Sequence, residues 1–186
     1  MQGRSDPDVK NRTEKHTHEF PPLYDARSRI LILGSFPSVK SREQQFYYGH
    51  PQNRFWKILA ALTGEAVPEN VQEKKTMALC HGIALWDVID SCEIIGSSDS
   101  SIRNALPTDL SVILDRCRIE KICTNGALAR KLYLKYQYPV TGMEPIALPS
   151  TSPANAAWSF ERLLESWQAV REGIRPGTEN ESCSLQ

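Results

Sequence analysis

The sequence lacks several features that would assign it to a specialised class of protein. Its 186 residues have no excess charge, because 22 Lys and Arg residues balance 22 Asp and Glu residues. A net charge of zero excludes a global attraction to polyanions, so such a partner must be bound by a local basic patch. No apolar run approaches the roughly 20 residues of a membrane-spanning helix. The first 20 residues also lack the apolar segment of a signal peptide, which predicts a cytoplasmic protein without a membrane partner.

The cysteines do not form a metal-binding or disulfide pattern. There are five of them, an odd number, and they never lie two residues apart. Cys117 and Cys123 flank a segment with strand character, which is poor geometry for holding a metal ion. We therefore expect reduced thiols, several of them in the core, and no metal site.

Strand-like and helix-like segments alternate along the chain. Four short apolar runs predict buried strands, and most are followed by a small or polar turn and then a helical pattern. The strands are expected at residues 30–33, 83–88, 119–124 and 145–148, and the helices at residues 53–62, 68–80, 126–136 and 152–172. This order predicts an α/β domain with a mostly parallel sheet covered on both faces. We place this domain at residues 21–172, between a disordered N-terminal tail (1–20) and a disordered C-terminal tail (173–186).

Ligands bind beyond the carboxyl ends of the strands in such sheets, so the loops at those ends are the candidate site. The loop after the first strand resembles neither a nucleotide-binding glycine motif nor the nucleophile elbow of serine hydrolases. It is basic, and its cations are interleaved with aromatic residues, which fits a phosphate backbone with an unstacked base. A solvated loop beside core aromatics explains the same pattern. The basic residues are Arg29, Lys40, Arg42, Arg54 and Lys57, and the aromatic residues are Phe46, Tyr47 and Tyr48.

The other two loops carry amide and hydroxyl groups. Asn125, at the end of the third strand, could present a donor and an acceptor to a nucleobase edge, although an Asn-Gly turn or a helix cap is the better explanation of this residue taken alone. In the loop LPSTSPANA, Ser152 is expected to cap the last helix, with Pro153 in its first turn. Backbone N–H groups and the positive end of that helix would then form a seat for phosphate.

Together the segments GSFPS, FYYGHPQNRFW, TNG and LPSTSPANA resemble the uracil-DNA glycosylase superfamily, and within it the hypoxanthine-DNA (deoxyinosine) glycosylase branch. The resemblance runs from about residue 20 to about residue 171. It implies a three-layer α/β/α sandwich with a central four-stranded, mostly parallel sheet. It also implies a monomeric, monofunctional DNA glycosylase of base excision repair without a cofactor. Such an enzyme binds DNA containing damaged bases, flips the deaminated base out, chiefly hypoxanthine, and hydrolyses its N-glycosidic bond.

The resemblance also implies roles for individual residues. Asn53 would be the catalytic residue, orienting the attacking water or contacting the sugar and base. Phe55 would stack on the flipped base, and Asn125 would hydrogen-bond its edge. Three residues, Ser150, Thr151 and Ser152, would hold the flanking phosphate and fill the gap that the flipped base leaves in the base stack. The other implied pocket residues are Phe36, Tyr48 and His50, with Gly34, Ser35 and Pro37 in the first-motif loop.

The sequence departs from other branches of the superfamily at two positions. Phe36 stands where many relatives carry an Asn or Asp that activates water, and Leu148 stands where the uracil enzymes carry a histidine. His50 could protonate the leaving base, or it could be a structural donor in a turn. Two alternatives stay open. One is a uracil or mismatched-pyrimidine glycosylase of the same superfamily, and the other is a non-catalytic nucleic-acid-binding module.

Overall fold

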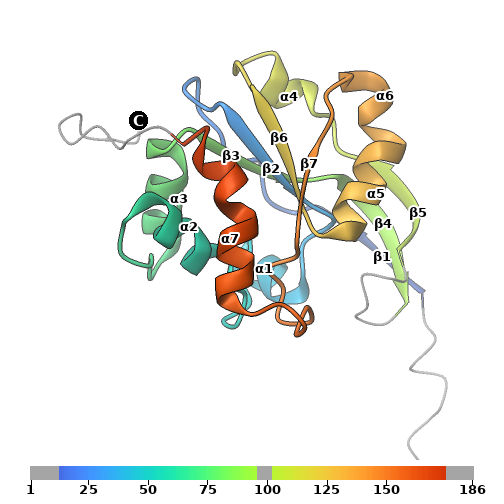
Figure 1. Cartoon of the computed structure of the whole chain (residues 1–186). Helices are drawn as coiled ribbons and strands as arrows, with labels where there is room; N and C mark the ends of the chain where they lie inside the picture. The colour runs from blue at the N-terminus through green and yellow to red at the C-terminus, as the bar shows by residue number, and fades with distance from the viewer. Residues whose placement is uncertain (1–12, 96–101, 175–186) are drawn as a thin grey trace, which may run out of the picture.

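A four-stranded parallel sheet forms the centre of the protein, as shown by a computed structural model that describes residues 13–95 and 102–174 (Figure 1). Its strands are β2 (Ile30–Gly34), β3 (Ile83–Asp87), β6 (Lys121–Asn125) and β7 (Ile146–Leu148), in the order β3-β2-β6-β7. Every residue of β2 and β3 is buried, so their unbroken apolar runs reflect a sheet covered on both faces. The four strands predicted from the sequence are confirmed.

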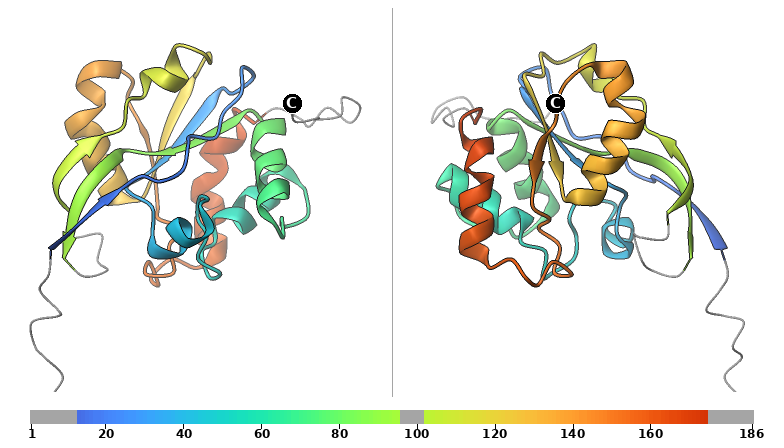
Figure 2. Two further views of the ribbon diagram at one scale, coloured as in Figure 1. Left: turned by 180° about the vertical axis from the view of Figure 1, so that it is seen from behind. Right: turned by 45° about the vertical axis from the view of Figure 1, so that its right-hand side comes forward.

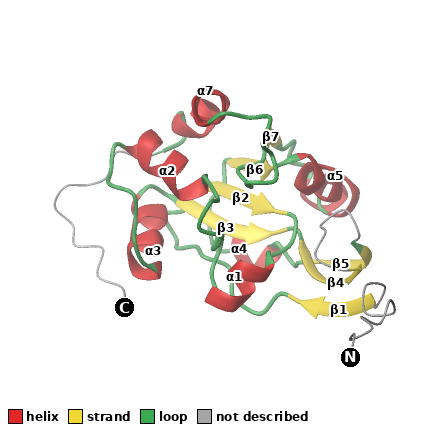
Figure 3. Cartoon of the chain, turned by 90° about the horizontal axis from the view of Figure 1, so that it is seen from below, coloured by secondary structure: helices red, strands yellow, loops and turns green. Residues whose placement is uncertain are grey.

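Helices cover both faces of this sheet (Figures 1 and 3). One face carries α2 (Phe55–Thr63), α3 (Val71–Cys80) and α7 (Phe160–Arg171), and the other carries α5 (Ala127–Tyr136) with α6 (Tyr138–Thr141). Two further short helices, α1 (Val39–Gln44) and α4 (Ser111–Leu114), lie in the connections. The expected three-layer α/β/α sandwich is confirmed. Among the described residues, no helix has the length and apolar character needed to cross a bilayer.

Helix α2 starts two positions later than predicted but buries the expected stripe. Phe55, Ile58, Leu59 and Leu62 are all at most 4% exposed. The rings of Phe55 and Trp167 meet edge to face at 5.7 Å, where α2 packs against α7. Gly64 ends the helix with a φ of 78°, a left-handed conformation that glycine adopts without steric cost.

The start of the last helix is a correction to the sequence interpretation. Helix α7 begins at Phe160, and its cap is Ser159, whose hydroxyl accepts a hydrogen bond from the backbone N–H of Arg162. Ser152 and Pro153 lie in the preceding loop instead. That loop uses its polar groups differently, because its carbonyl oxygens accept hydrogen bonds from a side chain described below as well as from the N–H groups of short turns.

A second, three-stranded antiparallel sheet was not predicted (Figure 2). Its strands are β1 (Thr13–Thr17), β4 (Ile89–Ile95) and β5 (Arg103–Pro107), in the order β1-β4-β5. Thr17 pairs with Ser91 and the following residues reach the core, where Phe20 is only 6% exposed. The assignment of residues 13–20 to a disordered tail is therefore wrong. In the predicted C-terminal tail, Gly173 and Ile174 are described and form turn hydrogen bonds to Val170 and Arg171. Residues 1–12 and 175–186 lie outside the described residues.

The chain that follows β1 also covers the outer edge of the central sheet. Leu23 and Leu85 form an isolated antiparallel bridge, with N···O distances of 3.0 and 2.8 Å in the two directions. The bridge satisfies backbone groups of β3 that would otherwise be exposed at an edge. It also fixes the path of the segment that carries His18 and Phe20 toward the carboxyl end of the sheet.

Candidate active site

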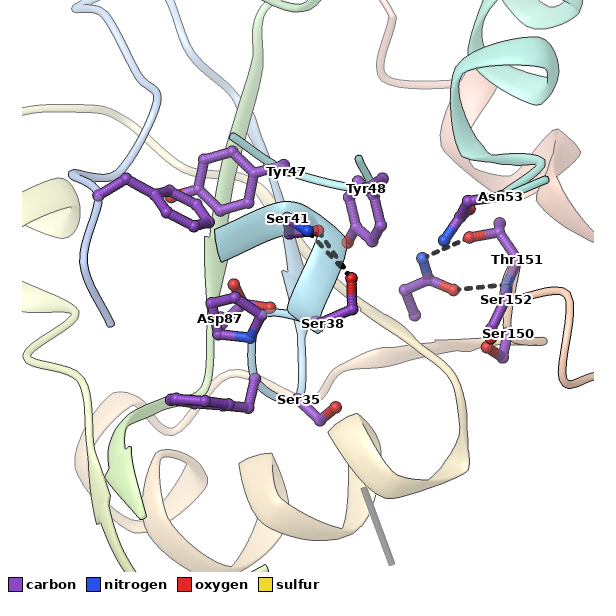
Figure 4. Close-up of a pocket in the computed structure, with 15 residues that line it drawn as sticks. Ser35, Ser38, Ser41, Tyr47, Tyr48, Asn53, Asp87, Ser150, Thr151 and Ser152 are labelled. Atoms are coloured by element: carbon purple, nitrogen blue, oxygen red, sulfur yellow. Dashed lines mark hydrogen bonds between the residues drawn. The ribbon is translucent and has the colours of Figure 1, made fainter. Parts of the chain in front are cut away.

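The loops at the carboxyl ends of the central strands surround a small pocket of about 90 Å³ (Figure 4). Of the residues expected at the site, its lining includes Gly34, Ser35, Phe36, Pro37, Tyr48, Asn53, Asn125, Ser150, Thr151 and Ser152. The lining also includes Phe20, Ser41 and Asp87, which the sequence did not indicate, and Ser38 and Tyr47, which lie in the quoted motifs but were given no role of their own. Two expected residues, His50 and Phe55, are not part of the lining. The structure thus brings together loops that lie far apart in the sequence.

Serine hydroxyls fold the loop after β2 back toward the sheet. Ser38 caps the short helix α1 by accepting a hydrogen bond from the backbone N–H of Ser41. The hydroxyl of Ser41 in turn accepts from the N–H of Gly49 at 3.1 Å. This link returns the chain to the pocket and delivers Tyr47 and Tyr48 into its wall.

The aromatic wall differs from the expectation for Phe55. This residue is fully buried, and its ring stacks on that of Tyr48 with centroids 3.9 Å apart and planes 20° apart. Phe55 therefore supports the wall from behind, and Tyr48 presents the aromatic surface to the pocket. The helical pattern indicated correctly that Phe55 is buried, but it carried no information on which side chain lies over it.

Asn53 is held rigidly at the start of α2. The side-chain Oδ1 of Asn53 accepts a hydrogen bond from the backbone N–H of Phe55 at 3.0 Å. The backbone N–H of Asn53 donates to the carbonyl of His50 at 2.8 Å. The imidazole Nδ1 of His50 accepts from the N–H of Gln52, so in this turn His50 acts as an acceptor and not as the donor that the sequence suggested. Asn53 therefore enters the pocket wall with its amide already oriented.

Asn125 and Thr151 form a two-point contact that ties the last loop to the sheet. The Asn125 amide donates to the hydroxyl of Thr151 at 2.9 Å and accepts from the backbone N–H of Thr151 at 3.0 Å (Figure 4). Thr151 is fully buried, and the N–H of Ser152 donates to the hydroxyl of Ser150. The expected phosphate seat needs correction, because these two N–H groups are engaged and α7 begins elsewhere.

Arg54 is a structural clamp rather than a free surface cation. Its guanidinium donates to the carbonyl oxygens of Thr151, Ser152, Asn155 and Trp158, at 3.4, 2.8 and 3.1 Å for the first three. Its backbone N–H donates to Thr151 as well. Five donors in a planar fork suit several converging carbonyl groups. The clamp ties the carbonyl oxygens of this non-helical loop to the start of α2.

Asp87 and His18 form a buried pair at the inner end of the pocket. His18 Nε2 lies 2.9 Å from Asp87 Oδ2, and the two side chains are 2% and 7% exposed. A Cβ on Gly34 would lie 2.2 Å from Asp87 Oδ1, so only glycine leaves room for this carboxylate. The sequence offered one weak signal, an aspartate that ends an otherwise apolar strand. It offered none for His18, which lies on a segment interpreted as a tail.

The surroundings of the two pocket tyrosines keep them protonated. Burial, followed by the negative charge of Asp87, raises the pKa of both Tyr47 and Tyr48 well above its usual value. The Tyr47 hydroxyl donates to the carbonyl of Pro21 at 3.0 Å. The Tyr48 hydroxyl is buried and forms no well-aligned hydrogen bond with the described residues, although the nearby Asn125 side chain offsets part of the rise in its pKa. Within the same residues, no group of three His, Cys, Asp or Glu side chains could hold a metal ion.

Comparison with known proteins places this site in a family. Residues 21–171 match the family model of the uracil DNA glycosylase superfamily. A hypoxanthine DNA glycosylase of Methanosarcina acetivorans is 39% identical over 155 residues, covering 81% of this chain and 95% of the relative. One of Methanosarcina barkeri is 36% identical over 109 residues, with 58% and 69% coverage. A solution NMR structure of a candidate uracil DNA glycosylase from M. acetivorans matches with a TM-score of 0.72 and 34% identity, covering 83% of this chain and 96% of the other.

Proposed function

Since this chain belongs to the uracil DNA glycosylase superfamily, we propose that it hydrolyses the N-glycosidic bond of deaminated bases in DNA, chiefly hypoxanthine in deoxyinosine. The names of the two Methanosarcina relatives support this substrate. The observation that carries the proposal is the oriented amide of Asn53, in the wall of a pocket lined by aromatic rings and hydroxyl groups. A base reaches such a pocket only when it is flipped out of the duplex.

The reaction needs a positioned water more than a strong nucleophile. As the C1′–N bond breaks, its electron pair leaves with the base and the sugar acquires oxocarbenium character. Water then adds to C1′ and loses a proton to solvent, and the departing base gains one. The phosphates of the DNA supply negative charge near the cation, so the contribution of the protein is positioning.

Asn53 has the geometry to position that water. One lone pair of its Oδ1 is occupied by the N–H of Phe55. The second lone pair and the amide hydrogens are available to a water molecule or to the sugar. A carboxamide does not accept a proton at neutral pH, so Asn53 orients the water without acting as a base. This role does not require a carboxylate at position 36.

The loop of residues 149–158 offers a path for the flanking DNA strand. On its outer side lies a groove of about 780 Å³, lined in part by Gly126, Arg130, Ser150, Ser152 and Trp158. Helix α5 begins beside this groove, so its positive end replaces the one that the sequence analysis expected from the last helix. The exposed cation of Arg130 and the two serine hydroxyls suit a phosphate contact.

Excision from oligonucleotides tests the proposal. The protein is expected to release hypoxanthine from deoxyinosine-containing DNA, which alkali then cleaves at the abasic site. Asn53→Ala is expected to lower the single-turnover rate at least about 100-fold, as for other lost positioning groups. Asn70→Ala is the matched control. Asn70 caps α3 with the same type of side-chain contact but does not line the pocket, so its rate should persist.

The same assay decides between the alternatives. Parallel reactions with uracil and mismatched thymine separate hypoxanthine preference from pyrimidine preference. If wild-type protein binds such DNA but leaves every deaminated base attached, the chain is a non-catalytic binding module and the proposed activity is wrong.

A further inference from the structure

We propose that Asp87 and Tyr48 recognise deamination itself, by binding the N–H and the carbonyl oxygen that deaminated bases place side by side. This inference rests on the proposed function and names the residues that select the base. Hypoxanthine and uracil each carry a ring N–H next to a carbonyl group. Adenine and cytosine carry a bare ring nitrogen next to an amino group at the equivalent positions. A pocket that presents an acceptor to the ring nitrogen and a donor to the neighbouring atom would bind hypoxanthine and uracil in preference to adenine and cytosine.

The acceptor is the free oxygen of Asp87. Its Oδ2 is held by His18 at 2.9 Å, and His18 is its only hydrogen-bond partner in the described part of the chain. The other oxygen, Oδ1, points to the end of β2, 2.2 Å from the position that a Cβ on Gly34 would occupy. A carboxylate accepts hydrogen bonds and donates none. His18 thus acts as a positioning residue that leaves one acceptor for a ligand.

The donor is the hydroxyl of Tyr48. It lies 3.6 Å from the same point beside Gly34, so donor and acceptor face one part of the pocket (Figure 4). Its oxygen is buried and forms no well-aligned hydrogen bond with the described residues, although the Asn125 side chain lies nearby. A buried hydroxyl left unsatisfied costs about 1–3 kcal/mol unless a ligand or water binds it. Because the ring is fixed by stacking on Phe55, the hydroxyl cannot easily turn to solvent.

The arrangement explains how the pocket would distinguish hypoxanthine and uracil from their parent bases, adenine and cytosine. A bare ring nitrogen facing Asp87 Oδ1 would place two lone pairs against each other in a site of low dielectric constant. Sites that hydrogen-bond a particular substrate group discriminate far more strongly than sites that depend on shape alone. Deamination converts this repulsion into a hydrogen bond to a charged acceptor.

Binding measurements that combine a change at residue 87 with a change at N1 of the base test this inference, and they do not depend on catalysis. The probes are single-stranded oligonucleotides with 2′-fluorinated deoxyinosine, whose glycosidic bond resists hydrolysis, and the same oligonucleotides methylated at N1 of the base. Methylation should weaken binding to wild-type protein about 10- to 100-fold, as expected for a lost hydrogen bond to a charged group. With Asp87→Ala, the same methylation should change affinity by about twofold or less. His18→Ala should give an intermediate coupling, because the carboxylate remains but is less well held.

The controls separate recognition from folding and from catalysis. Asp109→Ala removes an exposed aspartate outside the pocket lining and should keep the full methylation effect. If Asp87→Ala does not fold, Asp87→Asn replaces it, and its preference for fluorinated deoxyinosine over fluorinated deoxyadenosine should fall at least about tenfold. If methylation weakens binding equally in wild type and in the Asp87 variant, Asp87 does not contact N1 of the base and the inference is wrong. The same result is expected if Asp87 contacts only the sugar. Normal coupling without excision of deoxyinosine would instead refute the proposed activity alone.

Discussion

Arg54 holds the last active-site loop by four carbonyl contacts, so even a conservative substitution should be costly. Lysine keeps the charge but not the planar fork that reaches several acceptors. Arg54→Lys is expected to lower the free energy of unfolding by about 2–3 kcal/mol and to slow excision, because Thr151 would lose its position. Chemical denaturation and single-turnover kinetics measure the two effects.

Arg162→Lys is the matched control for Arg54→Lys. Arg162 donates to a single carbonyl, that of Ala157, and its exposed guanidinium lies over the ring of Trp158 at 4.6 Å. We expect a change within about 0.5 kcal/mol and an unchanged excision rate. Equal losses in both variants would show that the four-carbonyl clamp has no special importance.

Gly34 is expected to be sensitive because of the space it leaves, not because of its backbone conformation. Gly34→Ala would bring a methyl group against Asp87 Oδ1, which should cost about 1–3 kcal/mol of stability and reduce binding of the base. Gly64→Ala offers the contrast. It has open space but a φ of 78°, so it should lose about 1 kcal/mol without affecting excision. Excision assays at matched folded fractions compare the two, and normal activity in Gly34→Ala would contradict this account.

At the residue level, local motifs predicted the pocket better than they predicted its chemistry. Asn53 and the first-motif loop line the pocket, as the sequence indicated. Phe55 was misplaced because periodicity shows that a side chain is buried but not what covers it. Asp87 was missed because its partner lies 69 positions away in the chain, and no local pattern connects the two. Contacts of this kind exist only after the strands are assembled.

At the level of elements, burial on both faces made the central strands predictable. The apolar runs of β2 and β3 are continuous and fully buried, and most of the four runs are followed by a small or polar turn. The second sheet had no such signal. Strand β5 has four of its five residues exposed, and β1 has the polar sequence TEKHT. Their pairing comes from β4, so their structure is dictated by a neighbour rather than by their own composition.

The corrected start of α7 leads to a direct comparison of two serines. Ser159→Ala removes the cap of this helix and should lower the free energy of unfolding by about 1 kcal/mol. Ser152 lies in the loop, where its hydroxyl accepts from the N–H of Ala154 at 3.3 Å. Ser152→Ala should cost less than about half of that. Thermal denaturation of the two variants measures the difference, and the opposite ranking would favour the helix start first expected from the sequence.

In the whole molecule, the site depends on long-range ties between separate layers. The segment before β2 supplies His18, the connection to α2 supplies Asn53 and Arg54, and β6 holds the last loop through Asn125. Each tie joins elements that are adjacent in space but far apart in sequence. The pocket is therefore expected to form only with the complete fold, and its buried ionisable groups link it to global stability.

Alkaline pH should reveal this link through the pocket tyrosines. Burial and the charge of Asp87 raise the pKa of Tyr47 and Tyr48 in the folded protein, whereas the unfolded chain ionises them near the ordinary value of about 10. Above that pH the unfolded state releases protons that the folded state retains, so stability is constant below it and falls as pH rises through it. Each group contributes about 1.4 kcal/mol per pH unit.

Denaturant titrations from about pH 8 to about pH 11, a range that brackets the ordinary tyrosine pKa, measure this loss of stability. Near-ultraviolet absorbance reports the formation of tyrosinate. Tyr48→Phe removes one of the two groups, and its stability should therefore fall less steeply with pH than that of the wild type. The tyrosinate signal of both pocket residues should appear together with unfolding. If Tyr48→Phe and wild type lose stability with the same slope, the hydroxyl of Tyr48 ionises in the folded protein, and the pocket is more open to solvent than its buried oxygen indicates.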